Sequence, residues 1–190
     1  MPRRAGRPSD LLDDVEKDQL RVIVGVSGSL GSLHALRRAV AEARLRDAAL
    51  WAVITWVPKG GELANRRAPC LPLLQLWRDE AARTLCHAWE DALGGIPADL
   101  HVRMFALRGT PGQRLVAAAD RDSDLLVVGS GSSGPLGRLV NGSVSRYCVQ
   151  RARCAVLTVP PSLAERQLAH HPLARRRLIR ELTHPHAAQP

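Results

Sequence analysis

Short apolar segments alternate with longer amphipathic segments along most of the chain. The short segments are rich in β-branched residues and are bounded by Gly, Ser or Pro, a pattern that predicts buried β-strands. The third of them is weaker than the others. The predicted strands cover residues 22–26, 50–57, 100–107, 125–128 and 154–159.

The segments between the strands have apolar residues at helical spacing. Ser32 is the predicted N-cap of the first helix, and residues 59–70 are predicted to be a polar loop. The predicted helices cover residues 32–47, 72–94, 110–119 and 143–151. Strands that alternate with helices predict an α/β fold, an open parallel five-stranded sheet with helices on both faces.

Composition is that of one domain with an extension at each end. Of the 190 residues, 45% are hydrophobic, which is enough to fill a core. We assign residues 1–19 to a polar tail, 20–160 to the domain and 161–190 to a basic extension, either solvated, packed on the domain or docked to a partner. No apolar run approaches the ~20 residues of a membrane span, and no secretory signal is evident, so we expect a cytoplasmic protein.

The cysteines and the charge exclude some functions. None of Cys70, Cys86, Cys148 and Cys154 forms a C-x-x-C pair, which argues against zinc ribbons and thioredoxin-like sites, and we expect small buried side chains in a reduced compartment. The net charge of +9 comes almost entirely from Arg. Genome base composition explains such a bias, and a polyanion-binding surface is the alternative. Aromatic residues are only 3%, which argues against a platform for single-stranded nucleic acid.

A small-residue loop follows the fourth predicted strand. Residues 127–134 read Val-Val-Gly-Ser-Gly-Ser-Ser-Gly, and residues 141–145 read Asn-Gly-Ser-Val-Ser at the start of the last predicted helix. Backbone N–H groups at such a helix start bind anions such as phosphate, and the hydroxyls of Ser143 and Ser145 add donors. Ligands of parallel sheets bind beyond the carboxyl ends of the strands, so the loop after the first strand, residues 25–29, is expected in the same crevice.

Other catalytic and binding motifs are absent or weak. The chain lacks the G-x-x-x-x-G-K-[ST] motif of P-loop NTPases and the G-x-G-x-x-G fingerprint after its first strand. The run from Ser27 to Ser32 faintly resembles the first loop of ATP pyrophosphatases but lacks its second glycine and its Asp. Histidines 170, 171, 184 and 186 have no neighbouring Cys or carboxylate cluster, which argues against a metal site.

From about residue 20 to residue 159 the chain resembles the universal stress protein family. Nucleotide-binding members carry a glycine, two residues, a glycine, nine residues, and then glycine with Ser or Thr. The corresponding residues here are Gly129, Ser132, Gly142 and Ser143, so three of the four positions fit. The resemblance implies a Rossmann-like sheet of the adenine nucleotide alpha hydrolase type, ATP with Mg²⁺ on its phosphates, and a homodimer through the last strand.

The resemblance also implies a set of nucleotide-binding residues within the first two strand ends and residues 128–145. They are Val26, Ser27, Thr55, Val128, Gly129, Ser132, Gly142, Ser143 and Val144. Two of them depart from the family pattern. Ser27 replaces an acid, and a hydrogen bond to a charged group contributes about 1.5–3 kcal/mol. Ser132 replaces a glycine, and a left-handed backbone there would cost about 1–2 kcal/mol.

The predicted function is that of an ATP-binding stress-response regulator. No general base is evident, so we expect no enzyme activity beyond slow ATP hydrolysis. The alternative is an ATP-independent universal stress protein whose pocket is degraded at Ser27 and Ser132 and which acts as an interaction module for an unknown protein partner. Nucleic-acid binding through the arginine excess is the third and weakest hypothesis.

Overall fold

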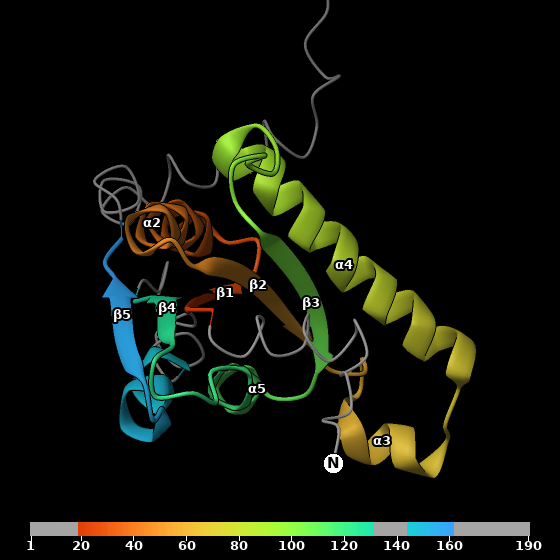
Figure 1. The fold of residues 1–190 in the computed structure, drawn as a ribbon. Helices are drawn as coiled ribbons and strands as arrows, with labels where there is room; N and C mark the ends of the chain where they lie inside the picture. The colour runs from red at the N-terminus through yellow and green to blue at the C-terminus, as the bar shows by residue number, and fades with distance from the viewer. Residues whose placement is uncertain (1–18, 131–143, 162–190) are drawn as a thin grey trace, which may run out of the picture.

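The computed structural model describes residues 19–130 and 144–161. Five parallel strands form one sheet in the order β3-β2-β1-β4-β5 (Figure 1). They are β1 (Arg21–Val26), β2 (Ala49–Trp56), β3 (Val102–Arg108), β4 (Leu125–Gly129) and β5 (Ala155–Val159). The predicted fold class is therefore confirmed. Strand order reverses direction between β1 and β4, which makes the carboxyl ends of these two strands the switch point of the sheet.

Helices cover both faces of the sheet, as Figure 1 shows. They are α2 (Leu30–Arg46), α3 (Gly61–Arg67), α4 (Leu71–Leu93) and α5 (Pro111–Ala118), and residues 144–151 are also helical. Helices α2 and α4 lie over one face, and α5 lies over the other. None of the helices in the described ranges combines the length and the apolar character that a bilayer crossing requires.

Alternate residues of each strand pack into two hydrophobic cores, one on each face of the sheet. Val22, Val24 and Val26 of β1 pack with α2 and α4, whereas Ile23 packs with Leu115 of α5. Period-two alternation places successive side chains on opposite faces of a sheet. Because both faces are covered, the strands are apolar on both sides, and this explains the uninterrupted apolar runs in the sequence.

The prediction of a loop over residues 59–70 is wrong, because α3 lies inside it. This seven-residue helix has no buried residue. Its position is stabilised by Glu62, whose carboxylate oxygens accept hydrogen bonds of 2.9 and 2.7 Å from the guanidinium of Arg108 at the end of β3. The stabilising contact joins residues 46 positions apart, and the local sequence contains no sign of it.

The prediction of Ser32 as the cap of α2 is also wrong. Ser29 is the N-cap, and its side-chain oxygen accepts a hydrogen bond from the backbone N–H of Ser32. Ser32 lies inside the first turn and is buried, at 6% exposure. The helix therefore begins earlier than predicted and brings Gly31 and Ser32 to the carboxyl edge of the sheet.

The expectation that all four cysteines are buried holds for Cys148 but fails for Cys70 and Cys86, which are exposed. Cys70 precedes α4, and Cys86 faces away from the sheet on the same helix. The apolar face predicted for this helix is buried only from Ala81 to Ala92. Leu71 and Leu76, in the first part of α4, are largely exposed, so this part extends past the core.

Candidate functional site

A cavity of about 170 Å³ lies at the carboxyl ends of the strands, at the switch point between β1 and β4. Its wall comes from β1, β2 and β4, the first turn of α2, α5, and the helix of residues 144–151. The residues that line it are Gly25, Val26, Ser27, Ser29, Gly31, Ser32, Val53, Thr55, Pro111, Leu115, Val128, Gly129 and Val144. The loop after the first strand lies at this edge as expected, whereas residues 131–143 of the loop after the fourth strand lie outside the described residues.

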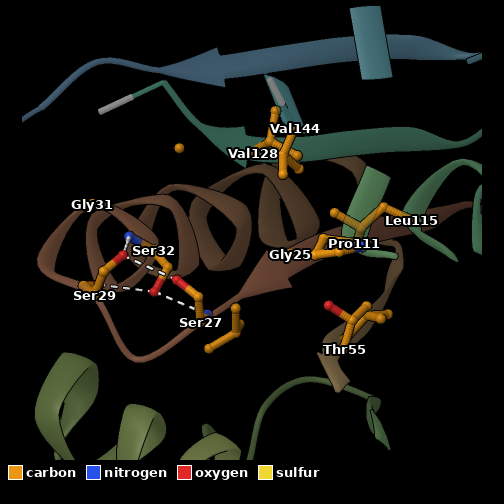
Figure 2. Close-up of a pocket in the computed structure, with 13 residues that line it drawn as sticks. Gly25, Ser27, Ser29, Gly31, Ser32, Thr55, Pro111, Leu115, Val128 and Val144 are labelled. Atoms are coloured by element: carbon orange, nitrogen blue, oxygen red, sulfur yellow. Dashed lines mark hydrogen bonds between the residues drawn. The ribbon is translucent and has the colours of Figure 1, made fainter. Parts of the chain in front are cut away.

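One wall of the cavity is apolar. Val128 and Val144 lie beside each other, and Pro111 and Leu115 come from α5 (Figure 2). Gly25 makes this wall possible, because a Cβ on it would lie 2.8 Å from Cδ1 of Leu115. A glycine in β1 therefore lets α5 approach the sheet and brings the leucine to the cavity. Such a wall suits the faces of a flat, weakly polar ring.

The opposite wall is built from serine hydroxyls, which Figure 2 shows linked to one another. The hydroxyls of Ser27 and Ser29 are 3.0 Å apart, and the hydroxyl of Ser32 accepts the backbone N–H of Ser27 at 3.1 Å. Ser32 donates its own proton to the carbonyl of Ser29 at 2.8 Å. These bonds hold the loop between β1 and α2 over the cavity with hydroxyl groups, and no charge, at its surface.

Gly129 has a packing role that the sequence did not reveal. A Cβ at this position would lie 2.8 Å from the carbonyl oxygen of Gly31 and 3.1 Å from its carbonyl carbon. The end of β4 therefore packs directly on the first turn of α2, backbone against backbone. The carbonyl of Gly129 also accepts a 2.9 Å hydrogen bond from the hydroxyl of Ser145, which ties the helix of residues 144–151 to the same strand end.

No ionisable side chain lines the cavity within the part of the chain that the structure describes. Its wall consists of aliphatic groups, hydroxyls and backbone. The first turn of α2 adds the partial positive charge of a helix N-terminus at the serine wall. The arrangement offers hydrogen bonds and a weak attraction for anions, without a proton-transfer group.

Comparison with known proteins decides the family. The model of the universal stress protein family matches residues 20–160. The chain belongs to the universal stress protein family. Universal stress protein Rv2005c of Mycobacterium tuberculosis is 29% identical over 156 residues, which cover 75% of this chain and 48% of that protein. This universal stress protein chain thus spans about half the length of the curated relatives it matches.

Two solved universal stress proteins illustrate the structural likeness. UspA from Lactobacillus plantarum is 21% identical, with a TM-score of 0.57, and the match covers 74% of this chain and 97% of that one. A universal stress protein in complex with cAMP is 26% identical, with a TM-score of 0.48, over 76% of this chain and 98% of that one. The first of these shows that the fold is shared.

Six of the nine residues predicted for the nucleotide site of this universal stress protein line the one cavity: Val26, Ser27, Thr55, Val128, Gly129 and Val144. The other three predicted residues, Ser132, Gly142 and Ser143, lie outside the described residues. Sequence reasoning missed Pro111 and Leu115, although Pro111 lies three residues after the end of β3, at the same edge of the sheet.

Proposed function

We propose that this universal stress protein domain binds an adenine nucleotide, ATP foremost, in the cavity at the switch point of the sheet. The observation that carries the proposal is the division of the cavity into an apolar wall and a hydroxyl wall at this point of a parallel sheet. Nucleotides have the matching division into a flat base and a polar sugar phosphate.

The two walls orient the ligand. The base would lie against Leu115 and Val128, and the ribose would lie beside Ser27 and Gly129. The phosphates would extend between Val144 and the first turn of α2, whose helix N-terminus favours negative charge. Mg²⁺ would enter with the phosphates, because the described lining offers it only neutral oxygens, while Mg²⁺ prefers phosphate and carboxylate oxygens.

We assign the domain a regulatory role and at most slow ATP hydrolysis. General acid–base catalysis needs a titratable group near the reacting atoms, and the described lining carries no carboxyl, imidazole, amine or thiol. Nucleotide binding would instead bridge β1, β4 and α5 and thereby change the surface that a partner protein meets.

Isothermal titration calorimetry with Mg-ATP, using the full chain, tests nucleotide binding. We expect saturable heat and a rise in melting temperature that grows with ATP concentration, since a ligand that binds only the folded state stabilises it. If millimolar ATP produces neither heat nor a melting shift, the proposal is refuted. Copurification of a nucleotide with the natural protein would support it independently.

A second function, an interaction module that does not use ATP, is favoured by the hydroxyl of Ser27 at a position where the family pattern implies an acid. The double variant Ser27→Asp/Ser132→Gly separates the two functions. If the natural chain binds ATP and the variant binds it more tightly, the nucleotide proposal stands. If only the variant binds ATP, the domain is an ATP-independent module.

We also propose that the domain forms a homodimer through β5. This strand lies at one edge of the sheet, and Ala155 and Thr158 on it are exposed. An unpaired edge strand is a ready surface for a second copy. Light scattering after size exclusion tests this, with a monomeric mass at micromolar concentration as the contrary result.

A further inference from the structure

A second hollow, of about 300 Å³, adjoins the first cavity at the carboxyl edge of the sheet. The second hollow lies between the end of β2 and the middle of α4, and it includes Trp56, Trp77, Lys59 and Glu80. Trp56 follows Ile54 on the strand face that packs with α4, whereas Val53, which lines the first cavity, belongs to the opposite face. The two spaces therefore lie toward opposite faces of the sheet and meet over its edge.

Two short side chains, Ser27 and Thr55, line both spaces. Ser27 is exposed, and its hydroxyl bonds to that of Ser29, as Figure 2 shows. Gly28 packs against α4, because a Cβ on it would lie 3.0 Å from Cγ2 of Thr84. The loop after β1 thus spans from the first cavity to α4. At the position where the two spaces meet, the chain has a small neutral residue.

The second hollow is suited to a planar ring. The indoles of Trp56 and Trp77 are both half-buried there. The guanidinium of Arg108 lies 5.7 Å from the ring centre of Trp56, and the buried Nε1 of this indole has no hydrogen-bond partner among the described residues. Trp56 therefore offers a ligand its ring and not its N–H group. Indole rings are favoured surfaces for stacking.

The charged side chains of the second hollow favour neither an anionic nor a cationic ligand. The ammonium of Lys59 and a carboxylate oxygen of Glu80 are 3.1 Å apart, and both side chains are mostly exposed. Their charges cancel locally, so a phosphate there would meet Glu80 as well as Lys59. A neutral ring packed on the indoles that line this hollow, with the ion pair available to polar atoms on its edge, fits the hollow better than a charged group.

We propose that the second hollow is a further chamber of the nucleotide site and binds a planar aromatic group attached to the 2′ or 3′ oxygen of the ribose. This rests on the proposed function, which places the ribose beside Ser27. From there a ribose substituent has a direct path over the edge of the sheet toward Trp77. An acid at position 27 would put a charge in that path, and the hydroxyl does not.

The probe is ATP that carries an N-methylanthraniloyl group on its 2′/3′ ribose oxygen, compared with ATP in the same full-length protein. We expect the probe to bind about tenfold more tightly than ATP, because stacking on aromatic side chains contributes about 1–3 kcal/mol per base, where 1.4 kcal/mol is a factor of ten. Tryptophan excitation should also produce anthraniloyl emission by energy transfer.

Substitutions in α4 test whether the aromatic ring of the probe stacks on Trp77. Trp77→Leu should bring the ratio of the affinities for the probe and for ATP close to one. Trp77→Phe, which keeps an aromatic ring, should retain most of the probe's advantage over ATP. Leu76→Ala is the matched control, because Leu76 is the preceding residue of α4, is 52% exposed and does not line the hollow. It should leave the affinity for the probe unchanged. Melting curves establish that each variant is folded.

Three results would overturn the inference. Equal affinity of the natural protein for probe and ATP would show that the second hollow contributes nothing. An advantage that survives Trp77→Leu would place the ring elsewhere. If neither nucleotide binds, the proposed function fails together with the inference, whereas in the first two cases ATP binding stands.

Discussion

A buried ion pair lies at the amino ends of the strands, far from the cavity, and breaking it should destabilise the fold. Arg21 opens β1, and its guanidinium donates to both carboxylate oxygens of Asp124, at 2.8 and 2.6 Å. The two side chains are 6% and 0% exposed. Asp124 also accepts the backbone N–H of Arg121 at 3.0 Å, and the ring of Trp51 covers the guanidinium at 4.4 Å.

Asp124→Ala removes the carboxylate and leaves a buried guanidinium without its bidentate partner. Breaking a buried pair in this way costs about 3–5 kcal/mol, a large part of the ~5–15 kcal/mol by which a domain is stable. Asp120→Ala is the matched control. Its carboxylate also lies 2.6 Å from Arg21, but its side chain is 67% exposed, and pairs exposed to solvent contribute about 0–1 kcal/mol.

Urea unfolding measures both variants, followed by circular dichroism and by tryptophan fluorescence. We expect Asp124→Ala to lower the free energy of unfolding by at least ~2 kcal/mol more than Asp120→Ala. Replacing both partners, as Arg21→Met with Asp124→Leu, should recover much of the loss, because an apolar pair leaves no buried charge. Equal losses from the two alanine variants would refute the reasoning from burial.

The remaining predictions concern acid stability, a glycine and a thiol. The hydrogen bond from Arg21 holds the pKa of Asp120 below its ordinary value, so the stability that this carboxylate contributes is present at neutral pH and is lost as the pH falls below about 4. Asp120→Ala should therefore flatten the fall of the melting temperature at acid pH, and an unchanged slope would contradict this prediction. Gly129→Ala should cost about 1–3 kcal/mol, because the methyl group meets a backbone carbonyl 2.8 Å away, and an unchanged melting temperature would contradict this. Burial raises the pKa of Cys148 to about 11, so peptide mapping after iodoacetamide at pH 8 should find Cys70 labelled well before it, and labelling at equal rates would show the thiol is accessible.

The strands were predictable because their signal is local. A run of β-branched residues bounded by glycine or proline marks a buried strand wherever the chain places it, and every predicted strand end lies within two residues of the observed one. The cap of α2 was not predictable in the same way. Ser27, Ser29 and Ser32 are equally good caps by residue type, and the choice of Ser29 accompanies the packing of Gly31 against β4, a contact between distant segments.

The same distinction applies to the candidate site. Ser27 and Gly129 belong to the two strand-end loops that parallel-sheet geometry places at one edge, whereas Thr55 was implied by the family resemblance. Leu115 was missed because its contact with the cavity depends on how closely α5 packs, which the missing side chain of Gly25 determines. Trp77 lines the second hollow because the first part of α4 extends past the sheet, and helical spacing alone does not show where a helix leaves the core.

Ser27 differs from the buried ion pair in exposure and charge, and this difference makes binding tests at Ser27 interpretable. At the amino ends, Arg21 and Asp124 are buried and charged, so their loss endangers the fold. At the carboxyl ends, Ser27 is exposed, and its hydroxyl has one side-chain hydrogen bond, to Ser29. A substitution there removes little buried area and leaves no buried charge unpaired, so Ser27→Asp should change the free energy of unfolding by less than about 1 kcal/mol. A change in nucleotide affinity in that variant therefore reports on the cavity itself and not on a population of unfolded protein.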